Sequence, residues 1–286
     1  MTPAERAVGE LRRDCAHIRT ELSRFASQVQ KLQRRTDRLS ALRAEEPGAV
    51  AWLDRFERTL DAEAVDAHLR TVVAKAVLVQ DPIPHLQVPD LLPIEVYRAL
   101  VDAIPARVFF EGGVEQGLEL RIPPRVAPVH GVVAWAFLTE VVLRSLSPLL
   151  VARFEEPLAA SARTRFPDLP PFREWGVEVT LSRGRIVGRG PGYVGPGAPD
   201  RPWDLLTTVL DLARPHDNEE AGSELQSMRM PFRANTSLTF LGHMASHAYS
   251  PIPEGAAATE RYSYEFGIGP DKEGQRRLAA MIHGDK

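Results

Sequence analysis

The chain has 286 residues, of which 44% are hydrophobic and 26% are charged, and its formal net charge is -3 at pH 7. This composition is ordinary for a soluble globular protein, and the length allows about two domains with a sizeable core. Because the chain carries no excess of positive charge, we expect no nucleic-acid partner. The single cysteine, Cys15, excludes an intrachain disulfide framework and a cysteine-based zinc site.

The N-terminal residues lack the apolar segment of a secretory signal peptide, and no uninterrupted apolar run of about 18 residues follows. We therefore expect a cytoplasmic protein without a membrane-spanning segment. Neither a Gly-x-Gly-x-x-Gly fingerprint nor a P-loop is present, which disfavours the nucleotide-binding folds that carry them.

Residues 8 to 39 have apolar side chains at heptad spacing, which predicts a long helix with a narrow apolar seam. The a positions are Val8, Cys15, Leu22, Val29 and Thr36, and the d positions are Leu11, Ile18, Phe25, Leu32 and Leu39. Two partners for this seam remain open. The chain can fold back on its next helix after a turn near Glu46-Pro47-Gly48, or a second copy can pair with it as a coiled-coil homodimer.

Residues 49 to 77 predict a second helix with one buried face, so we divide the chain into a helical segment, 1–78, and a second domain, 79–286. In that domain we expect strands at 83–88, 109–113, 118–122, 177–186, 205–212, 237–241 and 262–268. We expect helices at 92–104 and 129–151. Short strands separated by turns suit a β-sandwich or jelly roll.

Candidate catalytic and ligand-binding side chains lie between residues 192 and 266, each at the end of an expected strand. Asp200 lies in a Gly/Pro-rich turn, His247 follows strand 237–241, and Arg261 and Ser263 begin the next strand. A carboxylate and an imidazole are ligand types of the non-haem Fe(II) facial triad. An arginine nearby can pair in bidentate fashion with the carboxylate of a keto-acid co-substrate.

This stretch resembles the Fe(II)/2-oxoglutarate-dependent oxygenase superfamily, in its prolyl-hydroxylase-like branch. The resemblance covers residues 80 to 275 and is carried by Gly192-Tyr193, Asp200, Gly222-Ser223-Glu224-Leu225, Asn235, Ser246-His247 and Arg261-x-Ser263. It implies an α+β protein in which N-terminal helices precede a double-stranded β-helix core with flanking helices. It also implies Asp200 and His247 as catalytic ligands of Fe(II), and Tyr193, Arg261 and Ser263 as residues that bind 2-oxoglutarate.

One position departs from the family pattern. Ala198 stands where the proximal histidine of the His-x-Asp motif belongs, and alanine has no lone pair to give a metal. His130 is the upstream candidate to replace this ligand, although a histidine at a helix start is more often a surface or capping residue.

Two functions follow from this departure. The first is an oxygenase-like protein that oxidises or hydroxylates a small molecule, for example in specialised metabolism, with an incomplete metal triad. The second is a non-oxygenase on the same scaffold, either a non-redox enzyme or a binding or partner subunit. Under both, a buried Arg261 predicts an anionic ligand, the alternative being an ion pair with Glu260 or Glu265.

Overall fold

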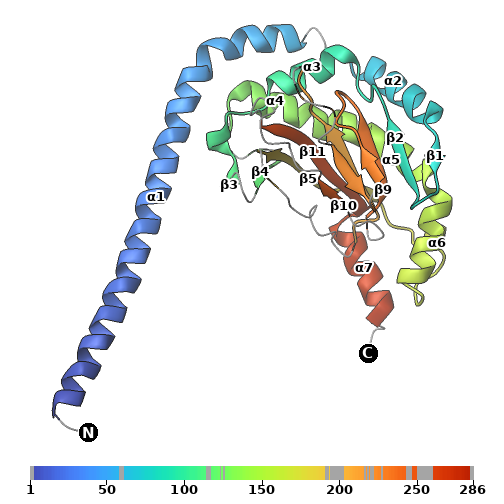
Figure 1. The fold of residues 1–286 in the computed structure, drawn as a ribbon. Coiled ribbons are helices and arrows are strands. Elements are labelled where there is room, and N and C mark those ends of the chain that lie inside the picture. The colour runs from blue at the N-terminus through green and yellow to red at the C-terminus, as the bar shows by residue number, and fades with distance from the viewer. Residues whose placement is uncertain are drawn as a thin grey trace. The chain divides into compact units, whose positions relative to one another are not determined.

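The structure, a computed structural model, describes residues 3–57, 61–113, 117–122, 124, 126–190, 193, 203–215, 217, 219, 222–226, 228–242, 247–249 and 260–283. The chain divides into two compact units, Met1–Pro47 and Gly48–Lys286, which are described separately. Figure 1 shows the course of the chain.

The first helix, α1 (Pro3–Glu57), continues through Pro47 and Gly48, and the next helix, α2, covers Ala62–Lys75. The predicted turn near residues 46 to 48, and the intrachain hairpin that depended on it, are therefore wrong. A proline inside a helix removes one backbone hydrogen bond. The strong helix formers Ala44, Glu45 and Glu46 directly before it favour continuation.

Residues 48 to 78 belong with the sheet rather than with the N-terminal segment to which we assigned them. The end of α1 buries Trp52 and Phe56, and α2 buries Val65, Leu69 and Val73 in the same core. The Asp61 side chain caps α2 by accepting a hydrogen bond of 2.9 Å from the Ala64 amide. The boundary between the compact units is at 47/48 instead of 78/79 because these apolar residues pack inside the second unit.

The described strands form two antiparallel sheets. The large sheet has the order β1 (Leu78–Val79), β2 (His85–Val88), β9 (Ser237–Leu241), β6 (Leu206–Asp211), β11 (Arg261–Pro270), β5 (Val179–Arg189), β4 (Gly117–Arg121), β3 (Glu111–Gly113). The small sheet has the order β10 (His247–Tyr249), β7 (Ser223–Leu225), β8 (Met228–Met230). The last strand, β11, lies between β5 and β6, so the chain is wound as a jelly roll rather than as a meander.

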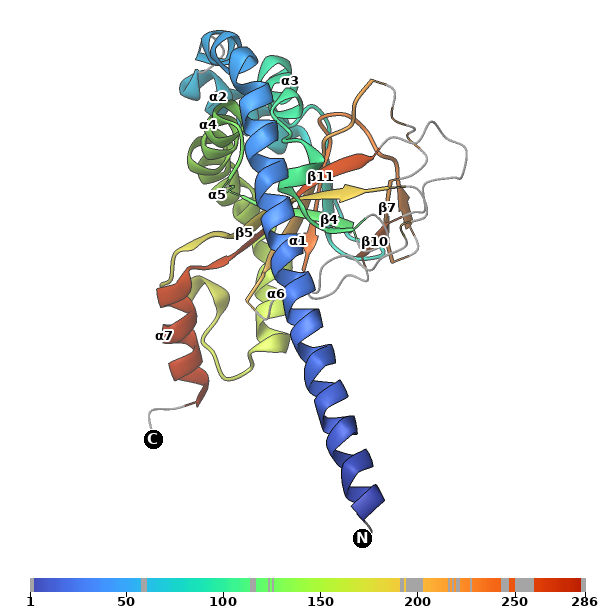
Figure 2. The same cartoon turned by 90° about the vertical axis from the view of Figure 1, so that its left-hand side faces the viewer.

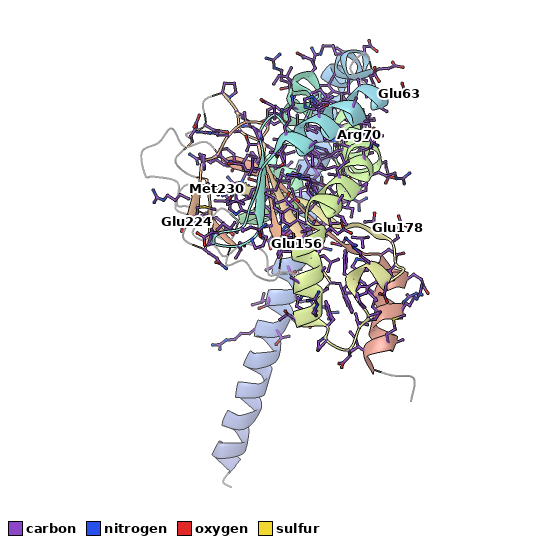
Figure 3. The ribbon with its side chains drawn as sticks, turned by 90° about the vertical axis from the view of Figure 1, so that its right-hand side faces the viewer. Glu63, Arg70, Glu156, Glu178, Glu224 and Met230 are labelled. Atoms are coloured by element: carbon purple, nitrogen blue, oxygen red, sulfur yellow. The ribbon has the colours of Figure 1, made fainter. Side chains whose placement is uncertain are left out.

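The two sheets face each other across an apolar layer, and Figure 2 shows the small sheet on one side of the large one. This layer consists of Ile83, Val209, Leu225, Met230, Leu238 and Phe240. Met230, labelled in Figure 3, contributes from the small sheet. This arrangement is the expected double-stranded β-helix core.

Helices cover the other face of the large sheet. They are α3 (Ile94–Asp102), α4 (Val129–Phe137), a π-helical turn (Leu138–Val142) and α5 (Leu143–Arg153). Trp135 of α4 stacks on Tyr264 of β11 with 5.7 Å between ring centroids. By length and composition Val129–Arg153 is apolar enough to cross a membrane, but here Trp135, Leu146 and Leu150 are buried in the protein core.

The remaining helices are α6 (Glu155–Arg165) and α7 (Lys272–His283), with 3-10 turns at Arg107–Phe109 and Phe172–Glu174. The α+β prediction with flanking helices is confirmed. Strand 237–241 has the predicted bounds, whereas residues 107 to 109 form a 3-10 turn before the short strand β3.

Candidate functional site

Strand β11 alternates charged or polar residues with aromatic ones, and both sets are buried. Tyr264 and Phe266 belong to the core beneath the helices. Arg261, Ser263 and Glu265 occupy the alternate positions, which point to the opposite face, toward the small sheet. Arg261 is 2% exposed and Ser263 is 0% exposed. The prediction that Arg261 lies inside the protein is confirmed.

A second arginine, Arg189, lies directly opposite Arg261 on the neighbouring strand β5 and is also 2% exposed. Arg189 Nη2 donates a hydrogen bond of 2.8 Å to Ser263 Oγ. Burial lowers the pKa of Arg189 to about 10, and the negative charges of Asp211 and Glu265 limit this decrease. Burial and the nearby Arg189 also lower the pKa of Arg261. The interior thus holds two guanidinium groups close together.

A buried carboxylate completes this group. Asp211, the last residue of β6, pairs with Ser263 in the register of β6 and β11 and is 9% exposed. Its Oδ2 accepts a hydrogen bond of 3.3 Å from the Arg233 amide, and Ser263 Oγ lies 3.5 Å from its Oδ1. Burial raises the pKa of Asp211 to about 7, although Arg189 opposes the shift.

The other arginines on this face have carboxylate partners of their own. Arg185 contacts Glu265 at 2.6 Å and Glu119 at 2.7 Å. Arg183 contacts Asp204 at 2.7 Å. These pairs neutralise the part of the sheet that adjoins the Arg189 and Arg261 group.

The two glutamates that we considered as partners for Arg261 pair with other arginines. Glu260 pairs with Arg107 at 3.0 Å, and Glu265 pairs with Arg185. The carboxylates that raise the pKa of Arg261 are Asp217, in the loop after β6, and Asp211.

Tyr193 lies beside the same group. Its amide donates a hydrogen bond of 3.2 Å to the Gly190 carbonyl, and its ring packs on Gly117, where a Cβ atom would approach the ring to 3.2 Å. Tyr193 also tends to raise the pKa of Arg189, which places its phenol in the electrostatic environment of that guanidinium. Tyr193, from the Gly192-Tyr193 motif, therefore lies near Arg189, the residue that contacts Ser263 of the Arg261-x-Ser263 motif.

The side chains of the predicted metal ligands are not among those that the structure describes. Asp200 and Ala198 lie outside the described residues. The backbone of His247 begins β10 and pairs with Leu225 of β7, but its side chain is not described. Within the described part of the chain, no group of three or more His, Cys, Asp or Glu side chains has metal-binding geometry.

His130, the possible replacement ligand, lies in the helical layer. Its ring is 5.5 Å from that of Trp52, which belongs to the core that α1 and α2 share with the sheet. This packing assigns His130 a structural role on the far side of the large sheet from Arg261.

Sequence reasoning missed Arg189 and Asp211. The available signal for Arg189 was the spacing of Arg183, Arg185 and Arg189, which puts all three on one face of a strand. For Asp211 it was a single carboxylate in the otherwise uncharged run 205–212. Neither pattern reveals which residues on other strands face these side chains.

A cavity described by the structure lies elsewhere. It has a volume of about 580 Å³ and includes Gln80, Pro84, Glu156, Ala160 and Leu241 in its lining. Glu156 is visible on α6 in Figure 3. Leu241 pairs with Leu206, at the opposite end of β6 from Asp211, so this cavity is separate from the arginine group.

The described strands form a double-stranded β-helix, and solved structures of Fe(II)/2-oxoglutarate-dependent oxygenases are similar to this chain in fold. No family model and no curated protein matches the sequence. Solved structures of such oxygenases are similar to the chain at low identity.

A prolyl-4-hydroxylase from Pseudomonas putida has 16% identity and a TM-score of 0.45, with 71% of this chain and 99% of that chain covered. A 2OG-Fe(II) oxygenase family oxidoreductase from Burkholderia pseudomallei has 15% identity and a TM-score of 0.42, covering 73% and 90%. HygX from Streptomyces hygroscopicus, solved with nickel and 2-oxoglutarate, has 12% identity and a TM-score of 0.37, covering 66% and 83%. These similarities concern the fold alone.

Proposed function

We propose that the protein is an oxygenase-like protein that binds 2-oxoglutarate, or a closely related keto dicarboxylate, in the interior of its β-helix and acts on a small molecule. One observation carries the proposal: Arg189 and Arg261 lie opposite each other on adjacent strands, both are buried, and Arg189 donates a hydrogen bond to Ser263. Two buried guanidinium groups side by side give this part of the interior a positive potential that favours an anion. A ligand carboxylate would accept hydrogen bonds from the guanidinium groups.

The residues of this region have distinct roles in the proposal. Arg261 and Arg189 bind the remote carboxylate of the co-substrate, Ser263 orients it, and Tyr193 borders it. The burial of Arg261 and Ser263 excludes water, which strengthens these electrostatic contacts. By resemblance, Asp200 and His247 would hold Fe(II), which supplies oxygen activation when it is bound.

Calorimetric titration with 2-oxoglutarate tests the proposal. We expect binding by the natural protein and at least a tenfold loss with Arg261→Gln, since a hydrogen bond to a charged group contributes about 1.5–3 kcal/mol. Arg98→Gln, which removes an exposed arginine on α3, is the matched control. Succinate formation in the presence of Fe(II) and oxygen then tests the oxygenase reaction. No binding by any variant would contradict the proposal.

A non-oxygenase function on the same scaffold is the second candidate. Two observations favour it: Ala198 replaces the proximal histidine of the resembling motif, and Asp211 already provides a carboxylate beside Ser263. Ala198→His discriminates the two candidates. If Fe(II) binding and succinate formation appear only in this variant, the natural protein does not carry out the redox reaction.

We also propose that α1 pairs with the α1 of a second chain. The described seam residues are exposed to the extent expected of an interface that is open in the single chain: Leu22 62%, Phe25 65%, Val29 48%, Leu32 64% and Leu39 59%. Thr36, the polar residue of the seam, donates its hydroxyl to the Leu32 carbonyl at 3.1 Å. Its polar group is therefore satisfied when the seam is covered.

A further inference from the structure

The proposed anion site already contains an acidic residue of the protein itself. Asp211 lies opposite Ser263 in the register, and two hydrogen-bond donors, the Arg233 amide and Ser263 Oγ, approach its two oxygens at 3.3 and 3.5 Å. Both distances are long for charge-assisted hydrogen bonds, which are typically about 2.7–2.9 Å. The fold therefore fixes the position of the Asp211 carboxylate but provides only weak hydrogen bonds to its oxygens.

The charges around Asp211 come from four sides. Strand β5 and the segment after it contribute Arg189 and Tyr193, and β11 contributes Arg261 and Glu265. The loop after β6 contributes Asp217. Tyr97 on α3 donates its hydroxyl to the Asp211 and Ala213 carbonyls. Glu265 is already paired with Arg185. The charge of Asp211 thus acts on both arginines, together with that of Asp217 on Arg261 and that of Glu265 on Arg189.

From this arrangement we propose that Asp211 controls entry of the anionic ligand by acting as its internal competitor. In its ionised form the carboxylate neutralises part of the charge of Arg189 and Arg261 and repels a dicarboxylate. In its neutral form it no longer repels the negative charge of the ligand, so that binding is coupled to the uptake of one proton. This inference rests on the proposed binding of 2-oxoglutarate.

Charge balance gives the direction of the effect. A dicarboxylate adds two negative charges to a region that holds two arginines, Asp211 and Asp217. If Asp211 stays ionised, the negative charges exceed the positive ones in a buried site, which is unfavourable. If Asp211 takes up a proton, the excess of negative charge becomes smaller, and the hydroxyl of the neutral carboxyl group can donate a hydrogen bond.

Titration near neutral pH makes the coupling measurable. Burial raises the pKa of Asp211 to about 7. For a ligand that binds only the neutral form, the dissociation constant rises about tenfold for each pH unit above that pKa. We expect this slope for 2-oxoglutarate between pH 7 and 9, a range in which the ligand itself stays fully ionised.

The experiment is a calorimetric titration of metal-free full-length protein with 2-oxoglutarate from pH 6 to pH 9, in buffers of different ionisation enthalpy. Asp211→Asn keeps the shape and hydrogen-bonding capacity of the neutral side chain without its charge. Glu119→Gln, which removes a carboxylate paired with Arg185 on the same sheet, is the matched control. Thermal unfolding verifies that each variant is folded, and Asp211→Ser replaces the asparagine variant if that one is not.

The expected result is uptake of about one proton by the natural protein and the control, with affinity falling as pH rises. The asparagine variant is expected to bind without this slope and at least about tenfold more tightly at pH 8. Equal affinity and equal pH dependence in all three proteins, or weaker binding by Asp211→Asn, would overturn the inference and leave the proposed function standing. No binding by any of them at any pH would overturn both.

Discussion

At the scale of single residues, the inner face of the large sheet is unusual in the number of charges it buries. Arg183, Arg185 and Arg189 on β5 share this face with Arg261 and Glu265 on β11. Burying a charge is tolerated where an opposite charge and hydrogen bonds accompany it. Some of these ion pairs stabilise the fold. Their removal should therefore lower the free energy of unfolding even when no ligand is present.

Asp204 should be among the most sensitive positions for folding. Its carboxylate is 1% exposed, accepts hydrogen bonds of 2.6 Å from Ser182 and 2.7 Å from Arg183, and is the partner of that partly buried arginine. Asp204→Ala leaves the guanidinium charge without this partner, so we expect a loss of about 3–5 kcal/mol in unfolding free energy, measured by urea denaturation. Glu95→Ala breaks an exposed pair with Arg98 and should cost less than about 1 kcal/mol. Equal losses in both variants would contradict this reasoning.

Asp211 should leave a signature in the pH dependence of stability even without ligand. Its pKa is raised by burial from 3.8 to about 7, so the folded state binds a proton more tightly than the unfolded state. The stabilisation is complete below the unfolded pKa and is lost as pH rises toward the folded pKa. Between about pH 4 and 7 unfolding free energy should fall by up to about 1.4 kcal/mol per pH unit from this group.

Comparison with Asp211→Asn isolates this contribution, because the variant keeps every other titrating group. We expect the difference between the two urea-denaturation profiles to decrease with pH in that window and to level off above it. A difference that is constant with pH would show that the carboxyl does not titrate differently in the folded protein.

At the scale of elements, α1 is distinguished by a seam that its own chain leaves exposed in the described residues 19 to 44. The a positions Val29 and Thr36 are β-branched, and the d positions Leu32 and Leu39 are leucine. This combination favours parallel two-stranded coiled coils. The polar flanks also suit a second copy, because Gln28 of one chain lies beside Gln33 of the other in a parallel pair.

Leu32→Glu should dissociate the proposed dimer. Leu32 is 64% exposed in the single chain, and its burial on both sides of a dimer contributes about 1.5–3 kcal/mol for each copy. We expect the dimer dissociation constant to rise at least about a hundredfold, measured by analytical ultracentrifugation. Arg34→Glu, on the opposite face of the helix, should leave association unchanged. If the natural chain is monomeric, or both variants dissociate alike, the seam is not a homodimer interface.

Orientation can be tested separately by crosslinking. In a parallel dimer Val29 faces Val29 of the other chain, so Val29→Cys in a Cys15→Ser background should form a disulfide-linked dimer on mild oxidation. The matched Arg34→Cys variant should crosslink much less. Crosslinking of neither variant in a confirmed dimer would indicate the antiparallel orientation.

At the scale of the whole molecule, we predict from the two compact units that the second unit folds independently of the association of the chains through α1. Removing residues 2–47 takes away the exposed seam but leaves Trp52 and Phe56 in the core of the second unit. We expect the shortened protein to be monomeric, with an unfolding free energy within about 1 kcal/mol of the natural monomer. Phe56→Ala, in contrast, should cost about 3–5 kcal/mol by opening a cavity in that core. A truncated protein that is unfolded would contradict the 47/48 boundary.

Much of the architecture followed from local patterns. The heptads of the N-terminal segment, the alternation along the strands and the apolar run at 129–151 predicted the right element types, because periodicity depends on neighbouring residues alone. The continuation of α1 past Pro47 was missed because a proline weakens a helix without always ending it. The domain boundary was missed because the spacing of apolar residues between 52 and 73 predicts that one helical face is buried. That spacing does not reveal which part of the protein covers this face.

The candidate site shows the same division. By itself, the sequence determined that Arg261 and Ser263 share one face of a strand and that Tyr193 precedes a glycine-rich turn, since these relations depend on spacing along the chain. Only the tertiary structure decided that Arg189 meets Ser263, 74 residues away in sequence, and that Asp211 lies opposite the same serine. Strand register brings such residues together, and it is set by the packing of the two sheets rather than by any local pattern.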